Sequence, residues 1–150
     1  MGGTSFLPLF FGSIMTKQEQ LQTYGKVVID ALSPIVKWQY NDFHGVMLAE
    51  FSMDKQEQVR LALQQVLPLS WDAKSIKKAP NEIKHKAHFF AKLSKNQMLL
   101  SDHLGNQPKI MVAWWPWGHG ATVSIRLFLT STAAYQEKSG LFHRLTGIFS

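Results

Sequence analysis

The sequence predicts a single domain of the α+β class, with helices packed on an antiparallel sheet of about five strands. Helix-period and strand-period patterns follow one another in the order α-β-β-α-α-β-β-β-α. Turn-forming residues separate these segments, and the chain contains no internal repeat or Gly/Ser linker. The length of 150 residues and the hydrophobic fraction of 45% suit one domain with its own core. We therefore expect the domain to cover residues 15–150, after an apolar extension over residues 1–14.

The first half of the chain predicts two helices on either side of a pair of strands. A capping box at Thr16 and Glu19 opens the first helix, and prolines stop both helices. The dipeptide Asn41-Asp42 suits a tight turn between the two strands. The expected elements are a helix over residues 16–33, strands over 35–40 and 43–51, and a helix over 54–67.

The second half predicts two more helices, then three strands and a terminal amphipathic segment. Ser70 can cap a short helix, and Pro80 suits the first turn of a longer one. The expected helices cover residues 71–78 and 80–95, the strands 97–103, 109–117 and 121–131, and the amphipathic segment 140–149. This order resembles that of roadblock-like and profilin-like layered domains. The resemblance is one of element order alone, without a residue motif, and implies no function.

The amino-terminal residues contain an apolar run over 6–11 that does not fit a targeting or spanning segment. No Lys or Arg precedes Lys17 and Pro8 interrupts the run, so a secretory signal is not expected. The run is also far shorter than the roughly 20 residues that span a bilayer. We expect a cytoplasmic protein. Three interpretations stay open for residues 1–14: an extension upstream of a start at Met15, an arm packed on the domain, or a segment touching a membrane.

Positive charge is concentrated in residues 74–95. The chain has a net charge of +6, and this segment alone accounts for it, with seven lysines against the single acid Glu82. On the expected helix the apolar residues share one face, so we expect a cationic stripe opposite them. A local field of this kind attracts phosphates or acidic partners, although a solvated helix face is the plain alternative. The expected polyanion-binding residues are Lys74, Lys77, Lys78, Lys84, His88, Lys92 and Lys95.

Tryptophans crowd the end of the strand over 109–117, which is apolar on both faces. One interpretation is that they fill space between the sheet and the helices. The other is a stacking platform for single-stranded bases, a sugar ring or a proline-rich peptide. The expected members of this platform are Trp115, Trp117, Arg126 and Phe128.

The sequence contains residue types used in catalysis and metal binding, but their spacing does not match that of a catalytic or metal-binding motif. The absence of Cys excludes a thiolate nucleophile, and His85 and His88 stand among lysines that oppose a cation. The adjacent residues 101–103, Ser-Asp-His, alternate between the faces of a strand, so they do not form a triad. His119 lies at a glycine-flanked turn and has no identifiable carboxylate partner. We therefore expect no catalytic residue, metal or cofactor.

The leading hypothesis is a non-enzymatic binding domain that engages a polyanion, most plausibly nucleic acid, through residues 74–95. Because the stripe contains lysines and no arginine, binding should depend little on base sequence. The alternative is an adaptor that binds a protein, a second copy of the chain or a membrane surface. Such an adaptor would use a sheet edge, the amphipathic segment over 140–149 or the apolar amino terminus. A third hypothesis is a small enzyme whose active site is centred on His119.

Overall fold

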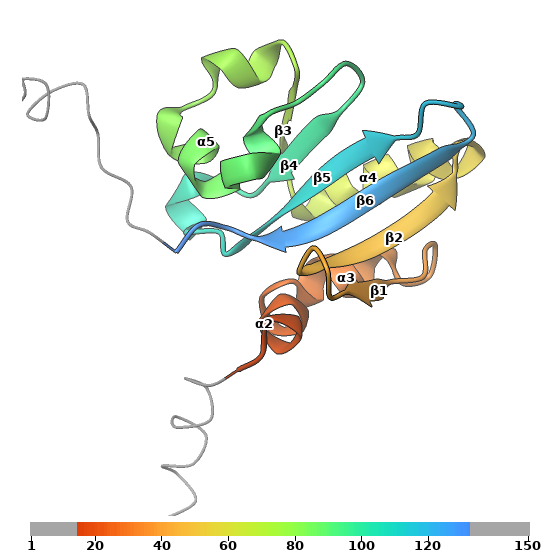
Figure 1. Ribbon diagram of the computed structural model, residues 1–150, viewed down its shortest axis with the longest axis horizontal. Helices are drawn as coiled ribbons and strands as arrows, with labels where there is room; N and C mark the ends of the chain where they lie inside the picture. Colours follow the sequence, from red (N-terminus) through yellow and green to blue (C-terminus); the bar gives the residue numbers. More distant parts are fainter. Residues whose placement is uncertain (1–14, 133–150) are drawn as a thin grey trace, which may run out of the picture.

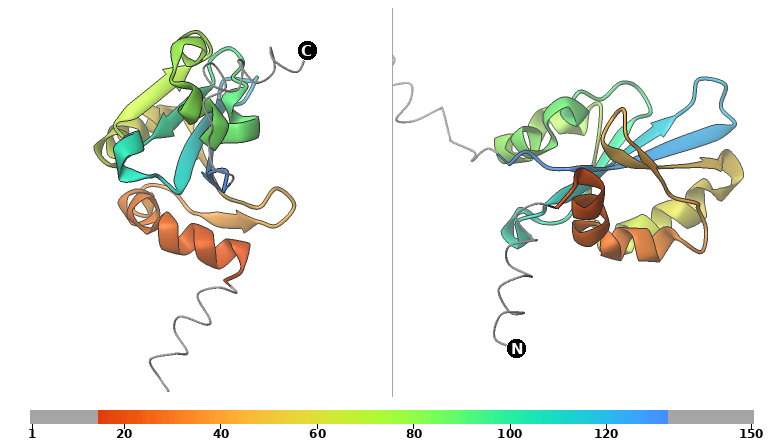
Figure 2. Two further views of the ribbon diagram at one scale, coloured as in Figure 1. Left: turned by 90° about the vertical axis from the view of Figure 1, so that its left-hand side faces the viewer. Right: turned by 60° about the horizontal axis from the view of Figure 1, so that its bottom comes forward.

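The computed structural model describes residues 15–132, which form three layers (Figure 1). The middle layer is a six-stranded antiparallel sheet with the order β1-β2-β6-β5-β4-β3. Helices α2, α3 and α4 cover one face, and a shorter segment around α5 covers part of the other (Figure 2). The expected α+β class with an antiparallel sheet is confirmed. The segments over 1–14 and 140–149 lie outside the described residues.

The elements follow one another in nearly the expected order. The helices are α2 (Lys17–Tyr24), α3 (Lys26–Leu32), α4 (Gln56–Val66) and α5 (Asn81–Ala87). The strands are β1 (Gln39–Asn41), β2 (Val46–Ser52), β3 (Leu69–Asp72), β4 (Met98–Ser101), β5 (Ile110–Pro116) and β6 (Thr122–Leu129). Two 3-10 turns flank α5, η3 (Ser75–Lys78) before it and η4 (His88–Ala91) after it.

The larger core lies between the sheet and helices α2, α3 and α4, on what we call the helical face. Alternate residues of β5 and β6 point into it, because successive side chains of a strand face opposite ways. Each helix contributes fully buried aliphatic residues, Leu21 from α2, Leu32 from α3 and Leu63 from α4. The indole of Trp114 on β5 is also in this core. The helical face is therefore closed by conventional amphipathic packing.

Residues 74–95 form a lysine lobe that packs on the opposite face of the sheet, which we call the lobe face. Its buried residues Ile83 and Phe90 contact Met111 and Phe128 of the sheet. The rings of Phe90 and Phe128 stack with centroids 4.1 Å apart and planes 19° apart. The lobe covers only one end of this face, and the β5–β6 hairpin extends beyond it (Figure 2, right). The lobe face therefore has a closed half and an open half.

The helix predicted over residues 16–33 is two helices that meet at Gly25. The N–H of Gly25 closes α2 by donating to the carbonyl of Leu21 at 2.8 Å, and α3 begins at the next residue. A Cβ on Gly25 would lie only 2.5 Å from Cδ2 of Leu127 on β6. Only glycine allows this close approach to the sheet, because it has no Cβ. Glycine also has greater conformational freedom than other residues, which favours the end of the first helix at this position.

The helix predicted over residues 71–78 is wrong, because these residues form strand β3 and the turn η3. Trp71 pairs with Leu99 of β4, and its side chain packs on the core under the lobe. Asp72 then turns the chain, since its carboxylate accepts the N–H groups of Lys74 and Ser75. The sheet consequently has six strands where about five were expected.

The helix predicted over residues 80–95 ends at Ala87, so the single cationic helix face does not form. His88 has φ 43° and starts the 3-10 turn η4, which brings Phe90 onto Phe128. The ring of His88 stabilises the end of the helix at this position. Its Nε2 lies 3.0 Å from the carbonyl oxygen of Leu129 and donates to it. Burial of Phe90 thus outweighs continuation of the helix.

The lobe should depend on Phe90 for its attachment. Replacing Phe90, which is 8% exposed, by Ala should lower the free energy of unfolding by about 3 kcal/mol through lost burial and a residual cavity. Phe89 on the same turn is 65% exposed, so Phe89→Ala is a matched control that should change it by less than about 0.5 kcal/mol. Urea unfolding measures both. Equal losses for the two variants would contradict this packing.

Candidate functional site

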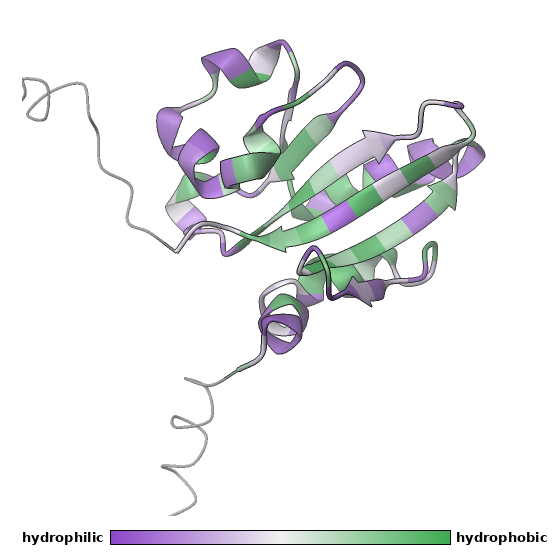
Figure 3. Ribbon diagram, in the orientation of Figure 1, coloured by the Kyte–Doolittle hydropathy of each residue, from purple (hydrophilic) through white to green (hydrophobic). Residues whose placement is uncertain are grey.

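The lysines of the lobe point outward and lack acidic partners. Five of them are exposed, while Lys84 and Lys86 are half-buried. Figure 3 shows hydrophilic residues along the outer side of η3 and α5. Among residues 15–132 the sole ion pair joins Lys26 and Asp30 of α3, which are remote in sequence from the lobe. The charge of the lobe is therefore not neutralised by carboxylates of the described chain.

The lysines do not line up on one helix but spread over the lobe. Lys84 projects from α5 toward η3, where its Nζ donates to the carbonyl of Lys77 at 3.1 Å. Lys92 and Lys95 come after η4 in the loop that leads to β4. Lys74 and Lys95, the first and last of the set, line the same cavity. The predicted set is thus brought to one lobe, although by two turns and a loop in addition to the helix.

His88 differs from the lysines with which it was grouped. Its Nε2 donates to the carbonyl of Leu129, and its ring stands edge-on to Phe90 and Phe128 with centroids 5.7 and 5.4 Å away. The imidazole holds η4 against the end of β6. We therefore assign His88 a structural role, which its position among lysines does not reveal.

Two of the four predicted stacking residues are covered by other side chains. Phe128 is 1% exposed beneath Phe90, so its place in an open platform is wrong. Trp115 is half-buried, with Cζ of Arg126 at 3.9 Å from its ring centroid and the Phe90 ring at 5.8 Å. Trp117 is 49% exposed at the end of the hairpin. The open half of the lobe face therefore presents the Arg126 guanidinium and the Trp117 indole.

Arg126 lies in a partly desolvated setting on the sheet. Burial lowers the pKa of Arg126, and the carboxylate of Glu50 on β2 partly opposes that shift. Next to it, Ser124 is 3% exposed, and within the described chain its Oγ and the Nε1 of Trp115 have no hydrogen-bond partner. The guanidinium lies over the indole of Trp115, and both residues are half-buried.

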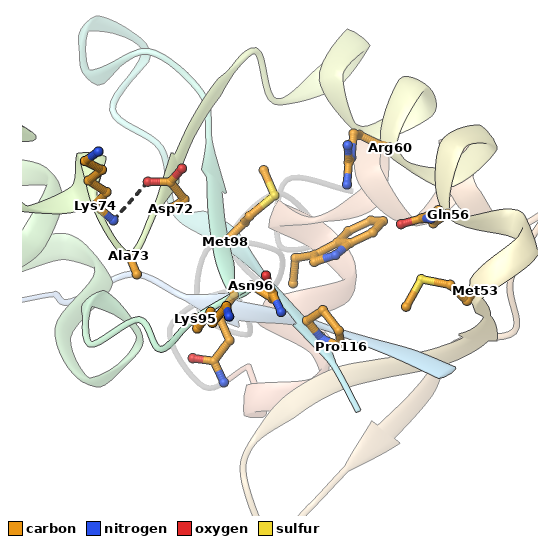
Figure 4. Close-up of a pocket in the computed structure, with 12 residues that line it drawn as sticks. Met53, Gln56, Arg60, Asp72, Ala73, Lys74, Lys95, Asn96, Met98 and Pro116 are labelled. Atoms are coloured by element: carbon orange, nitrogen blue, oxygen red, sulfur yellow. Dashed lines mark hydrogen bonds between the residues drawn. The ribbon is translucent and has the colours of Figure 1, made fainter. Parts of the chain in front are cut away.

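A cavity of about 480 Å³ opens on the helical face, where β3 ends, β4 begins and β5 ends (Figure 4). Its apolar lining comes from two methionines, an indole and a proline, and its polar lining is richer in cations than in acids. The lining residues are Met53, Gln56, Arg60, Asp72, Ala73, Lys74, Lys95, Asn96, Gln97, Met98, Trp114 and Pro116. Asp72 is the only carboxylate among them.

Arg60 is the functional candidate that sequence reasoning missed. It projects from α4 toward the indole of Trp114, with Cζ 5.4 Å from the ring centroid (Figure 4). Its Nε is shielded from solvent and has no hydrogen-bond partner among residues 15–132. The available signal was the spacing of Gln56 and Arg60, which lie one turn apart on the helix next to its apolar stripe.

Asp72 shapes the wall of the cavity from which the lobe departs. Its Oδ1 accepts the N–H of Ser75 at 2.7 Å and that of Lys74 at 3.0 Å, and its own N–H donates to the Ser75 hydroxyl at 2.9 Å. These bonds, those with Ser75 above all, hold the pKa of Asp72 below its ordinary value. The carboxylate is thus used to fix the backbone at Lys74.

The other residues with catalytic side chains have local structural roles. Ser101 donates its hydroxyl to the carbonyl of Asp102, whose carboxylate accepts the His103 N–H and the Asn106 amide. His119 accepts the N–H of Ala121 through Nδ1 at 3.0 Å. Within the described chain, no three His, Cys, Asp or Glu residues gather closely enough to hold a metal. These contacts do not link a nucleophile to a base.

Comparisons with protein-family models, curated proteins and solved structures gave no match. None of the helices in residues 15–132 has the length and apolar character needed to cross a membrane. The site is therefore interpreted from its own geometry and charge.

The Asp72 turn should make stability depend on pH in a definite direction. Because the pKa of Asp72 is lowered in the folded state, its contribution is present above the unfolded value of about 3.9 and is lost as pH falls through the folded value. Asp72→Asn should therefore lower Tm at pH 7, and the difference should close as pH falls below the unfolded pKa of Asp72. Thermal melts of Asp72→Asn and of the exposed control Asp42→Asn measure this. A pH-independent difference for Asp72→Asn would refute it.

Proposed function

We propose that the protein binds a polyanion, most directly single-stranded nucleic acid, through the lysine lobe and the open half of the lobe face. The observation that carries the proposal is the gathering of seven lysines on one lobe, without a carboxylate in ion-pair distance among residues 15–132. Mutual repulsion among these ammonium groups is relieved when phosphates approach. The proposal includes a cytoplasmic location, and it describes a binding module without catalysis.

The energetics of such binding follow from the type of cation. Phosphates neutralised by lysines release condensed counterions, so affinity should fall steeply with salt. Lysine is a point charge that does not match base edges bidentately, so little sequence selectivity is expected. Lys77, Lys78 and Lys92 are exposed, whereas Lys84 is engaged by the carbonyl of Lys77. The exposed lysines are the ones we assign to phosphate contacts.

The open half of the lobe face supports a single strand as the form of the polyanion. Arg126 presents a guanidinium whose Cζ lies 3.9 Å from the centroid of the Trp115 ring, and Trp117 presents an indole that is half exposed. Unpaired bases stack on both kinds of surface, and such stacking tolerates any base. Arg126 shares the lobe face with Phe128, two residues further along β6, and Trp117 follows the end of β5 two residues after Trp115. A strand that places its phosphates on the lysines can therefore bring its bases toward these groups.

The first test removes charge from the lobe alone. The triple variant Lys77→Gln, Lys78→Gln, Lys92→Gln should bind a fluorescent single-stranded 20-mer at least about tenfold more weakly at low salt. Its plot of log affinity against log salt should be shallower by about two, since each lost contact removes about 0.7 from the slope. Fluorescence anisotropy over a salt series measures both quantities.

A matched triple variant separates the lobe from net charge. Lys26→Gln, Lys37→Gln, Lys55→Gln removes the same charge from exposed positions outside the lobe, and it should keep most of the affinity. Equal weakening by both triples would show that binding is not located on the lobe. Absence of binding by the unmodified chain, or binding that salt does not change, would overturn the proposal.

A further inference from the structure

We propose that the cavity beside Arg60 is a separate binding site for a nucleoside 5′-phosphate, either a free mononucleotide or the 5′-phosphorylated end of a strand. The cavity belongs to the helical face, because Trp114 and Met98 in its wall pack with the core under α4. It lies on the other side of the sheet from Arg126 and Trp115. This inference does not rest on the proposed function of the lobe.

The charge of the cavity selects an anion. Arg60, Lys74 and Lys95 line it, while the carboxylate of Asp72 is engaged by the N–H groups of the turn that follows β3. Arg60 is the central group, because it lines the cavity along with the two lysines and lies against the apolar wall, with its Cζ 5.4 Å from the centroid of the Trp114 ring. A guanidinium matches phosphate oxygens bidentately through its terminal N–H groups, so Arg60 can hold a phosphate at this wall.

The volume and the apolar walls of the cavity indicate a ligand larger than a phosphate ion. A space of about 480 Å³ is in the range of small-molecule sites, which is roughly 300 to 1,000 Å³. Inorganic phosphate would leave most of it empty. Met53, Met98, Trp114 and Pro116 supply apolar contact for a flat group next to the anion (Figure 4). A ligand that fits both halves of the site carries a phosphate on a ring-bearing body.

The polar groups on the wall fit the edge of a nucleobase. Gln56 and Asn96 each carry an amide that donates and accepts, as base edges do. Gln97 is already engaged, since its Oε1 accepts the N–H of Ser94 at 2.8 Å. This bond and the left-handed backbone of Asn96, with φ 70°, form the turn that places Lys95 at the cavity. The turn is therefore built to present a cation and an amide together.

The test replaces the arginine at the cavity and compares it with an exposed cation outside both sites. Arg60 lies over Trp114 on the helical face. Isothermal titration of the full chain with the four ribonucleoside 5′-monophosphates should detect binding of at least one of them at millimolar concentration or tighter. Arg60→Met, which keeps length and packing, should weaken it at least about tenfold. Lys37→Gln, an exposed change outside the cavity and the lobe, should leave it within about twofold.

Further titrations compare related ligands with the nucleotide, and a second variant controls for loss of folding in Arg60→Met. The matching nucleoside and inorganic phosphate should each bind far more weakly than the nucleotide. Lys95→Gln, an exposed change in a loop, should also weaken nucleotide binding several-fold and serves if Arg60→Met melts early. A 5′-phosphorylated oligonucleotide that competes with the nucleotide better than its unphosphorylated form identifies a strand end. Lack of that difference identifies the free nucleotide.

The outcomes separate this proposal from that for the lobe. The lobe triple variant Lys77→Gln, Lys78→Gln, Lys92→Gln should keep nucleotide binding while it loses affinity for the long strand. Absence of binding by all four nucleotides, equal binding by Arg60→Met, or equal binding of nucleoside and nucleotide would each overturn the cavity proposal. None of these three results bears on whether the lobe binds a polyanion.

Discussion

The stacking of Phe90 on Phe128 is the contact on which the arrangement of the lobe face depends. It attaches the lysine lobe to the sheet, and it is reached only because the chain leaves the helix at His88. The lobe therefore begins and ends at the same edge of the molecule, where Lys74 and Lys95 line one cavity. A continuous helix through Lys95 would have carried the last lysines away from the sheet.

Strand alternation at two adjacent tryptophans produces two different environments. Trp114 points to the helical face beneath Arg60, and Trp115 points to the lobe face beneath Arg126. The first pair lines a cavity that opens beside α4 where β3 and β5 end, whereas the second pair is half-buried on the lobe face. One strand thus contributes a tryptophan to a cavity on one face of the sheet and a tryptophan to an arginine–indole contact on the other.

The three strands over 97–103, 109–117 and 121–131 could be predicted because apolar runs bounded by turn residues are a local property of the chain, and clean alternation over 121–131 also predicted the faces of that strand. The concentration of lysine was equally visible. Three deviations could not be seen, because each depends on a contact distant in sequence or on side-chain geometry: Gly25 against Leu127, the Asp72 turn, and Phe90 on Phe128. The Arg60 cavity was missed for the same reason, since it is assembled by the pairing of Met98 with Trp114 under α4.

The contacts made by the acidic residues near the lysine lobe explain why its positive charge is not cancelled. Asp72 gives its carboxylate to backbone N–H groups, and Glu50 acts on Arg126 in the sheet. Glu82, the one acid inside the lobe, makes no ion pair with its lysines. The acids around the two sites therefore shape the chain or hold an arginine, and they do not cancel the ammonium groups. Because these carboxylates are engaged elsewhere, the lysines leave a cationic surface on the described chain. A surface of this kind attracts anions from outside the chain.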